Sequence, residues 1–260
     1  MRVTVLGCGG SAGVPRVGND WGRCDPANPR NRRRRPAVLV ERGAASVLID
    51  TPPDLRQQLL DARVTDLDAV LFTHDHADHT HGIDDLRYLR RGRDAPPIDA
   101  YGTPETLAAL DRRFGYVFRG AEGEQGAPYR PFLKARPIYG PFPVAGIDVT
   151  PFEQDHGYGG VSTGFRLGDM AYTTDAVGLP DAAFDGALRG LELWIVGCLR
   201  FEPHPTHAHF AQAIAWIERA KPKCAVLTGM NQSVDYAAIA ARCPPGVEPA
   251  YDGLTIEIPD

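Results

Sequence analysis

The stretch Thr73-His74-Asp75-His76-Ala77-Asp78-His79 decides how this chain is interpreted. It places three histidines and two aspartates within six consecutive positions, and both side-chain types bind hard or borderline divalent metal ions. The apolar run from Leu67 to Phe72 comes just before it. This order predicts a buried strand that ends at Thr73 and opens into a loop of metal ligands.

The spacing of these side chains indicates two metal positions. His74 and His76 point the same way from an extended backbone, because alternate side chains share a face. Asp78 and His79 begin the next turn and face a second point. One short loop can therefore hold two ions. The alternative is a polar loop with solvated histidines, which needs a chance cluster of this order directly after an apolar strand.

The bulk composition is that of an ordinary globular protein. The chain has 260 residues, of which 23% are charged and 43% hydrophobic. A net charge of −5 gives no overall attraction to nucleic acid or to an anionic membrane. No apolar segment reaches the roughly 18 residues of a membrane span. The segment Met1 to Leu6 resembles a first strand rather than a signal peptide, so we expect a cytoplasmic protein.

The five cysteines do not predict a disulfide framework or a cysteine-only zinc site. Their number is odd, and no two of them have Cys-x-x-Cys spacing. We expect small core residues or free thiols at Cys8, Cys24, Cys198, Cys224 and Cys243.

Short apolar runs rich in Val and Ile recur along the chain and predict strands. They lie at Val3–Leu6, Ala37–Glu41, Ser46–Asp50, Ala69–Thr73, Ile98–Tyr101, Ile147–Thr150, Gly164–Leu167, Met170–Thr173, Leu193–Cys198, Ala225–Thr228 and Thr255–Ile258. Helical periodicity predicts helices at Asp54–Ala62, with Leu55, Leu59 and Leu60 on one stripe, and at Pro104–Phe114, His209–Lys221 and Tyr236–Cys243.

Strands and helices alternate only in part, and the early strands are close enough to form hairpins. This predicts sheets covered by helices rather than a doubly wound parallel sheet. The Gly- and Pro-rich segment from Gly115 to Pro143 shows little periodicity, and it predicts a long irregular connection.

The run Gly7-Cys8-Gly9-Gly10-Ser11-Ala12 formally matches a dinucleotide fingerprint. That fingerprint requires a helix at this point, because the helix N-terminus holds the pyrophosphate. The following Gly13-Val14-Pro15 and Gly18-Asn19-Asp20 are poor helix formers. We therefore expect a tight glycine loop near the active site rather than a nucleotide site, with plain turn geometry as the alternative.

Three further residues at strand ends are candidates for the metal site. Asp50 could orient a metal-bound histidine or cap the helix near Asp54. His156 is a candidate because the first cluster supplies too few ligands for two ions. Asp175 could bridge two ions or serve as a simple turn aspartate.

The segment His204-Pro205-Thr206-His207-Ala208-His209 precedes a predicted helix and concentrates three of the eight histidines. It could supply a general acid, because imidazole titrates near neutrality. The alternative is an exposed polar loop with Thr206 as a helix cap. The basic run Asn31-Arg32-Arg33-Arg34-Arg35 is either a solvated loop or an aid in attracting a phosphate substrate, and it is too short to indicate nucleic acid binding.

Taken in order, Asp50, His74-x-His76-x-Asp78-His79, His156 and Asp175 resemble the metallo-β-lactamase superfamily along essentially the whole chain. The resemblance implies one domain over residues 1–260, an α/β four-layer αββα sandwich with a dinuclear metal site at the sheet edge. Within the superfamily, Gly7 to Pro15 and Gly253-Leu254 are similar to the phosphodiesterase branch that includes the cyclic ribose-phosphate phosphodiesterase of phosphonate degradation.

This resemblance also implies site roles. His74, His76 and His156 would hold one metal ion, Asp78 and His79 the other, and Asp175 would bridge them. His207 corresponds to the candidate acid of that branch, and we count it and Asp78 as the catalytic residues.

Two departures from the family pattern affect the prediction. Trp21 to Pro26 keeps only Cys24, so the structural zinc knuckle of the related enzyme is not expected. Leu227 to Gln232 contains no histidine, and either Gly229 or Asn231 stands where the last ligand is expected. Asn231 could give a weak oxygen ligand, and His207, His209 or water could fill the gap. We expect a second ion that is weaker by about 10–100-fold or more.

The sequence thus predicts a metal-dependent hydrolase, with a metal-bound hydroxide attacking a small or cyclic phosphodiester. Its cofactors would be two divalent ions of zinc or manganese, with iron as a further choice. Its partner would be a small phosphate ester rather than a membrane or nucleic acid, and the chain could form a homodimer. The alternatives are a hydrolase of a thioester, a lactam or an RNA 3′ end, and a single-metal or non-catalytic binding protein.

Overall fold

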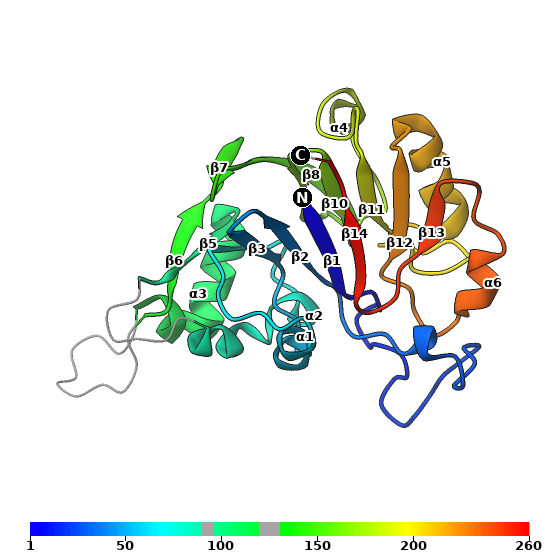
Figure 1. Ribbon diagram of the computed structural model, residues 1–260, viewed down its shortest axis with the longest axis horizontal. Helices are drawn as coiled ribbons and strands as arrows, with labels where there is room; N and C mark the ends of the chain where they lie inside the picture. Colours follow the sequence, from blue (N-terminus) through cyan, green and yellow to red (C-terminus); the bar gives the residue numbers. More distant parts are fainter. Residues whose placement is uncertain (90–95, 120–130, 260) are drawn as a thin grey trace.

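Two mixed β-sheets packed face to face form the centre of the molecule (Figure 1). The computed structural model describes residues 1–89, 96–119 and 131–259. In these residues each sheet has seven strands. The first sheet runs in the order β14 (Leu254–Glu257), β1 (Arg2–Gly7), β2 (Ala37–Arg42), β3 (Ala45–Ile49), β4 (Ala69–Leu71), β5 (Ile98–Gly102) and β6 (Leu133–Pro137). The second runs in the order β13 (Val247–Pro249), β12 (Cys224–Thr228), β11 (Leu193–Gly197), β10 (Met170–Thr173), β9 (Gly160–Leu167), β8 (Ile147–Gly157) and β7 (Phe142–Val144).

Helices cover the outer face of each sheet, which gives the four-layer αββα arrangement (Figure 1). Residues of α1 (Leu55–Asp61), of the 3₁₀ helix η2 (Ile83–Tyr88) and of α3 (Pro104–Arg119) pack on the first sheet. Residues of α4 (Asp181–Asp185), α5 (Phe210–Ala220) and α6 (Tyr236–Ala240) pack on the second. The remaining short elements are η1 (Pro29–Asn31) and α2 (Ala77–Thr80). The fold class expected from the sequence is confirmed. Within the described ranges, no helix combines the length and the apolar character needed to cross a membrane.

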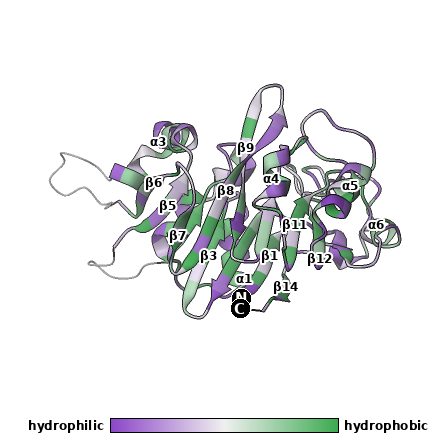
Figure 2. Ribbon diagram, turned by 90° about the horizontal axis from the view of Figure 1, so that it is seen from above, coloured by the Kyte–Doolittle hydropathy of each residue, from purple (hydrophilic) through white to green (hydrophobic). Residues whose placement is uncertain are grey.

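Alternation along the first sheet explains its continuous apolar runs. Val38 and Val40 of β2 face the second sheet, whereas Leu39 faces the helices. Because both faces are buried, both sets of alternate side chains are apolar. Figure 2 shows hydrophobic residues concentrated in central strands such as β1, β3 and β11.

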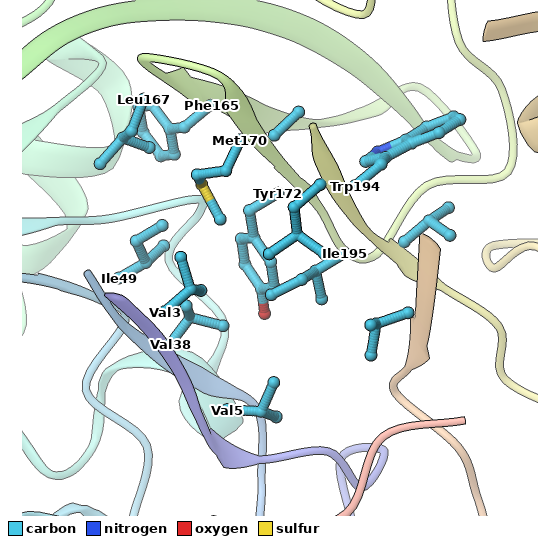
Figure 3. Close-up of a cluster of buried hydrophobic side chains, with 14 of the residues drawn as sticks. Val3, Val5, Val38, Ile49, Phe165, Leu167, Met170, Tyr172, Trp194 and Ile195 are labelled. Carbon is cyan, nitrogen blue, oxygen red and sulfur yellow. The ribbon is translucent and has the colours of Figure 1, made fainter. Parts of the chain in front are cut away.

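The core between the sheets joins segments that are distant in sequence. Val3, Val38 and Ile49 of the first sheet lie opposite Met170 and Tyr172 of the second (Figure 3), and all five side chains are fully buried. This packing fixes how the ends of the two sheets meet, since interiors are as densely packed as organic crystals and allow little sliding.

The parallel parts of both sheets end at one edge of the molecule. Strands β3 and β4 pair in parallel in the first sheet, and β10, β11 and β12 do so in the second. The sheets are tied together there, because Thr163 N of β9 donates to Thr73 O just after β4, at 2.8 Å. The loops that follow these strands therefore converge.

The sequence prediction was wrong about part of the segment from Gly115 to Pro143. Helix α3 continues to Arg119, with a kink at Phe114 (φ −130°, ψ 32°), because Val117 is buried in the core under the first sheet. Strands β6 and β7 follow in the same segment as edge strands of the two sheets. These edge strands are short and partly exposed, so their sequences lack a clear hydrophobic pattern. Residues 120–130 of the expected connection lie outside the described residues.

Smaller differences concern element ends. Leu60 is 56% exposed, so it does not share the buried stripe of Leu55 and Leu59. Helix α6 ends at Ala240 rather than at Cys243. The strand before the histidine loop ends at Leu71, two residues earlier than expected, because the backbone of Thr73 turns to pair with Asp50.

Candidate metal centre

Strand ends from both sheets supply the candidate ligands. Asp50 directly follows β3, and Asp175 lies two residues after the end of β10. Both have left-handed backbone conformations, with φ of 64° and 49°. Non-glycine residues adopt this conformation rarely and often where a site requires it. Both residues are buried, and both carboxylates lie close to His79.

The histidine loop is shaped by the single helical turn α2. His76 is its N-cap residue, in extended conformation, and Asp78 and His79 lie within the turn. Asp75 is the member of the cluster that turns away, because its carboxylate pairs with Arg113 of α3 at 2.5 Å. Only four of the five ligand-type side chains of the opening motif therefore face the centre.

Three histidines form the first part of the centre. His156 Nε2 lies 3.3 Å from His76 Nδ1, and the rings of His74 and His76 are 4.5 Å apart. One ligand atom from each of the three lies within 4.8 Å of the others, which is close enough to share an ion. His74 Nε2 is buried and has no hydrogen-bond partner among the described residues. A buried imidazole nitrogen without a hydrogen-bond partner, close to ligand atoms of two other histidines, fits a divalent metal site.

The second part of the centre is formed around His79. Its Nδ1 lies 2.7 Å from Asp50 Oδ2, and its Nε2 lies 3.5 Å from Asp78 Oδ2. His79 Nε2 and Asp175 Oδ2 are 2.8 Å apart but are not aligned as a hydrogen bond. Two ligands that face a common cation approach each other in this way. A second triad, His74, His79 and Asp175, thus also satisfies the distances of a metal site.

Three protein acceptors fix the orientation of the histidine rings. His74 Nδ1 contacts the hydroxyl of Thr73 at 2.9 Å, and His156 Nδ1 contacts the carbonyl of Thr206 at 3.1 Å. Asp50 does the same for Nδ1 of His79. In each ring Nε2 is then the nitrogen that faces the other candidate ligands. Such outer contacts are typical of metal-binding histidines.

Burial and charge shift the pKa values in the centre in opposite directions. Burial lowers the pKa of His74 well below its usual range, which keeps it in the neutral form that binds metal. Burial also acts to lower the pKa of His79, but the carboxylates of Asp175 and Asp50 outweigh it and raise that pKa well above normal. Burial would raise the pKa of Asp175, yet His79 and His207 lower it well below normal. The centre therefore attracts positive charge.

Asp50 orients His79 and does not cap the first helix. Burial raises its pKa, and the hydrogen bonds from His79 and Thr73 only partly offset this effect. Thr73 donates to Asp50 through both its backbone N and its hydroxyl. The N-cap residue of α1 is Asp54. The sequence left two interpretations of Asp50 open, and the geometry favours the orientation of a histidine over the capping of a helix.

His207 lies against the other oxygen of Asp175. Its Nε2 is 2.5 Å from Asp175 Oδ1, and its Nδ1 is 2.7 Å from the hydroxyl of Thr206. His156, Asp175 and His207 form the third metal-compatible triad found in the described chain. Thr206 is not a helix cap, because α5 has His209 at its N-cap. His209 belongs to none of the three triads.

Gly229, rather than Asn231, occupies the gap left by the missing histidine. Asn231 Oδ1 accepts hydrogen bonds from the backbone N and the hydroxyl of Ser233, at 2.9 and 2.7 Å. Gly229 lines a cavity of about 10 Å³ together with Asp78, Asp175 and His207. That volume holds about one water molecule. A Cβ atom at Gly229 would meet no atom within 4 Å.

Sequence reasoning missed the contacts of Thr73 and the position of Cys198, whereas it did expect the glycine loop near the centre. Thr73 supports both Asp50 and His74, and its place directly before the histidine motif was a usable signal. Gly10 and Ser11 line the small cavity, so the glycine loop does lie beside the centre. Cys198 lines the same cavity, and burial raises the pKa of its thiol to about 12. All five cysteines are free thiols.

A family model described as a beta-lactamase superfamily domain matches residues 45–230. The chain belongs to the metallo-β-lactamase superfamily. It is similar to a solved structure described as a new diphosphatase from the PhnP family, with 32% identity, a TM-score of 0.89, and coverage of 99% of this chain and 98% of that one. Human tRNase Z, short form, shares the fold with a TM-score of 0.70 at 18% identity, over 100% of both chains.

Two curated relatives match over only part of their length. A protein named octanoyltransferase from Porphyromonas gingivalis is 33% identical over 98% of this chain, which spans 51% of that protein. A ribonuclease Z from Bradyrhizobium sp. (strain ORS 278) is 34% identical over 38% of this chain and 33% of its own length. The chain thus spans about half or less of these relatives.

Proposed function

We propose that this chain is a metal-dependent phosphodiesterase that hydrolyses a small or cyclic phosphodiester. The observation that carries the proposal is Asp175, which lies between the histidines of the centre on one oxygen and His207 on the other. The similar proteins named as a PhnP-family diphosphatase and as ribonucleases Z support the same class of reaction. The octanoyltransferase supports no acyl transfer here, because this chain spans only 51% of it.

The proposed cofactors are two divalent ions, zinc or manganese, with iron as a further choice. His74, His76 and His156 would hold one ion, Asp78 and His79 the other, and Asp175 would contact both. When bound, the ions would supply Lewis acidity at the phosphate and lower the pKa of a coordinated water toward about 7. Cytoplasmic location and the formation of a homodimer stay predictions from the sequence.

The chain's own groups orient the reaction. Thr73 accepts from Nδ1 of His74 and donates to Asp50, which in turn accepts from Nδ1 of His79. One hydrogen-bonded chain thus sets the tautomers of two ligands. His207 is partly exposed, at 22% of its side chain, and its Nε2 contacts Asp175. From there His207 would donate a proton to the leaving oxygen while Thr206 holds its other ring nitrogen.

The test compares two leaving groups. Loss of a proton donor harms a poor leaving group most, so His207→Gln should lower kcat on a ribose 2′,3′-cyclic phosphate far more than on bis(p-nitrophenyl) phosphate. The metal content, measured by mass spectrometry, should stay unchanged. His81→Gln is the matched control, because His81 is exposed and packs on Phe114.

Two outcomes would contradict the proposal. Equal losses on both substrates, together with a lower metal content, would make His207 a ligand rather than an acid. If the metal-loaded protein hydrolysed neither substrate and held one ion or none, a degenerate binding protein would replace the phosphodiesterase.

A further inference from the structure

The basic run of the sequence is divided among separate partners. Its first three arginines are engaged away from the metal centre. Arg32 lies over the ring of Trp21, Arg33 is buried and donates to the carbonyl of Val234 at 2.8 Å, and Arg34 pairs with Asp61 at 2.7 Å. The run as a whole is therefore not a diffuse basic patch, and Arg35 has to be considered by itself.

Arg35 is held in place by the residue that begins α1. One oxygen of Asp54 accepts the backbone N of Arg35 at 2.9 Å and lies 3.1 Å from its Nε. Asp54 is the N-cap residue of α1, yet its side chain makes no capping hydrogen bond. Aspartate at this position usually caps the helix. Here its carboxylate fixes the direction of Arg35 instead.

The two terminal nitrogens of Arg35 are left uncommitted. Neither Nη makes a hydrogen bond within residues 1–89, 96–119 and 131–259, and the side chain is 27% exposed. A guanidinium anchored through Nε still offers its paired Nη–H groups, which match two oxygens of a phosphate. Because Asp54 already fixes the side chain, little conformational freedom is lost when an anion binds.

Arg35 lines a shallow groove of about 640 Å³ that opens beside the metal centre. Ser11 and Asp78 line both this groove and the small cavity next to Asp175. The other arginine of the groove, Arg16, is already paired with Asp20, with Nε 2.8 Å from Oδ2. Among the described residues that line the groove, Arg35 is therefore the arginine with both Nη groups uncommitted.

We propose that Arg35 binds an anionic group of the substrate beyond the scissile phosphate, so that the preferred substrates carry a second phosphoryl group, as in a diphosphate diester. This inference rests on the phosphodiesterase function proposed above. A phosphate at the metal centre that continues past Asp78 into the groove brings its neighbour toward Arg35. Arg35 is then a positioning residue for the part of the substrate that does not react.

The test uses one substrate with a single phosphoryl group, bis(p-nitrophenyl) phosphate, and one with two, P1,P2-di(adenosine-5′) diphosphate. Arg35→Gln should lower kcat/KM for the diphosphate by about 10–100-fold, mainly through KM, as expected for a lost charge-assisted hydrogen bond. It should change bis(p-nitrophenyl) phosphate hydrolysis less than about twofold. The kcat/KM of Arg35→Lys for the diphosphate should lie between those of the wild type and of Arg35→Gln, because lysine keeps the charge but not the paired donors.

Arg34→Gln is the matched control, since it removes the neighbouring arginine but faces Asp61 on another surface. It should leave both substrates within about twofold. Equal losses on both substrates in Arg35→Gln would make the Arg35–Asp54 pair merely structural. A wild-type protein that hydrolyses the monophosphate diester but not the diphosphate would overturn this inference and leave the phosphodiesterase intact. Hydrolysis of neither would overturn the proposed function itself.

Discussion

The two parts of the candidate metal centre contain different types of ligand side chain. The part formed by His74, His76 and His156 has three imidazoles, which come from the loop after β4 and from the end of β8. The part around His79 relies on the carboxylates of Asp78 and Asp175. One part therefore has a complete set of nitrogen ligands, whereas the other depends on buried negative charge.

The difference agrees with the expectation from the sequence that the second part lacks a histidine ligand. Gly229, with a φ of 73°, stands where an imidazole is expected and leaves room for about one water. Asp50, fully buried behind His79, still holds that ring in place. We therefore expect unequal affinities for the two ions, and the following experiments test that inequality from its largest expected effect to its smallest.

The largest effect is expected from the three-histidine part. His76→Ala removes one of its imidazoles, so kcat/KM for bis(p-nitrophenyl) phosphate should fall by more than the ~10–100-fold typical of a lost supporting contact. Metal content per chain should fall with it. His81→Ala, which changes an exposed histidine of the same segment, should alter neither. Unchanged activity in His76→Ala would rule out the proposed site.

The second experiment measures the difference in affinity between the two ions. Calorimetric titration of the metal-free protein with Mn²⁺ should show two events whose affinities differ by about 10–100-fold. Gly229→His should bring them closer by tightening the weaker event, because a Cβ atom at this position meets no other atom within 4 Å and the residue lies beside Asp78 and Asp175. Gly229→Ala is the control, since it carries the same left-handed strain without an imidazole. If both variants behave alike, the gap is not a lost ligand position.

A smaller effect is expected from Asp50, which supports His79 in the second part of the centre. Asp50→Asn keeps an oxygen for Thr73 or His79 but removes the charge that faces His79. The weaker Mn²⁺ event should lose about tenfold in affinity, in the range found for supporting residues. The stronger event should change much less. An equal loss in both events would show that Asp50 supports the centre as a whole.

The smallest effect concerns Asn231. Its side-chain oxygen is occupied by Ser233, so Asn231→Ala should leave both metal affinities within about twofold and lower the free energy of unfolding by about 1 kcal/mol. Denaturant unfolding and the same titration measure the two quantities. A lower affinity for the second ion would instead indicate that Asn231 is a ligand.

Local sequence pattern predicted most of the strands and sheets covered by helices, and the family resemblance implied the αββα class. Strand β10 lies at Met170–Thr173 as expected, because its four residues are all buried and form a short, largely apolar run. The prediction missed β6, β7 and β13, which are edge strands of three to five residues. Their stability comes from pairing with a neighbouring strand rather than from their own composition.

The sequence alone determined which side chains could bind metal, because the motif from His74 to His79 carries its ligands at local spacing. Only the tertiary structure decided which distant groups join them. It brought His207 to Asp175 across 32 positions, turned Asp75 away to Arg113, and left the gap at Gly229 rather than at Asn231. It also gave Arg35 and Arg34 different partners, Asp54 and Asp61. The physical reason is that such choices depend on how two buried sheets pack, and this packing is not encoded in any short stretch of chain.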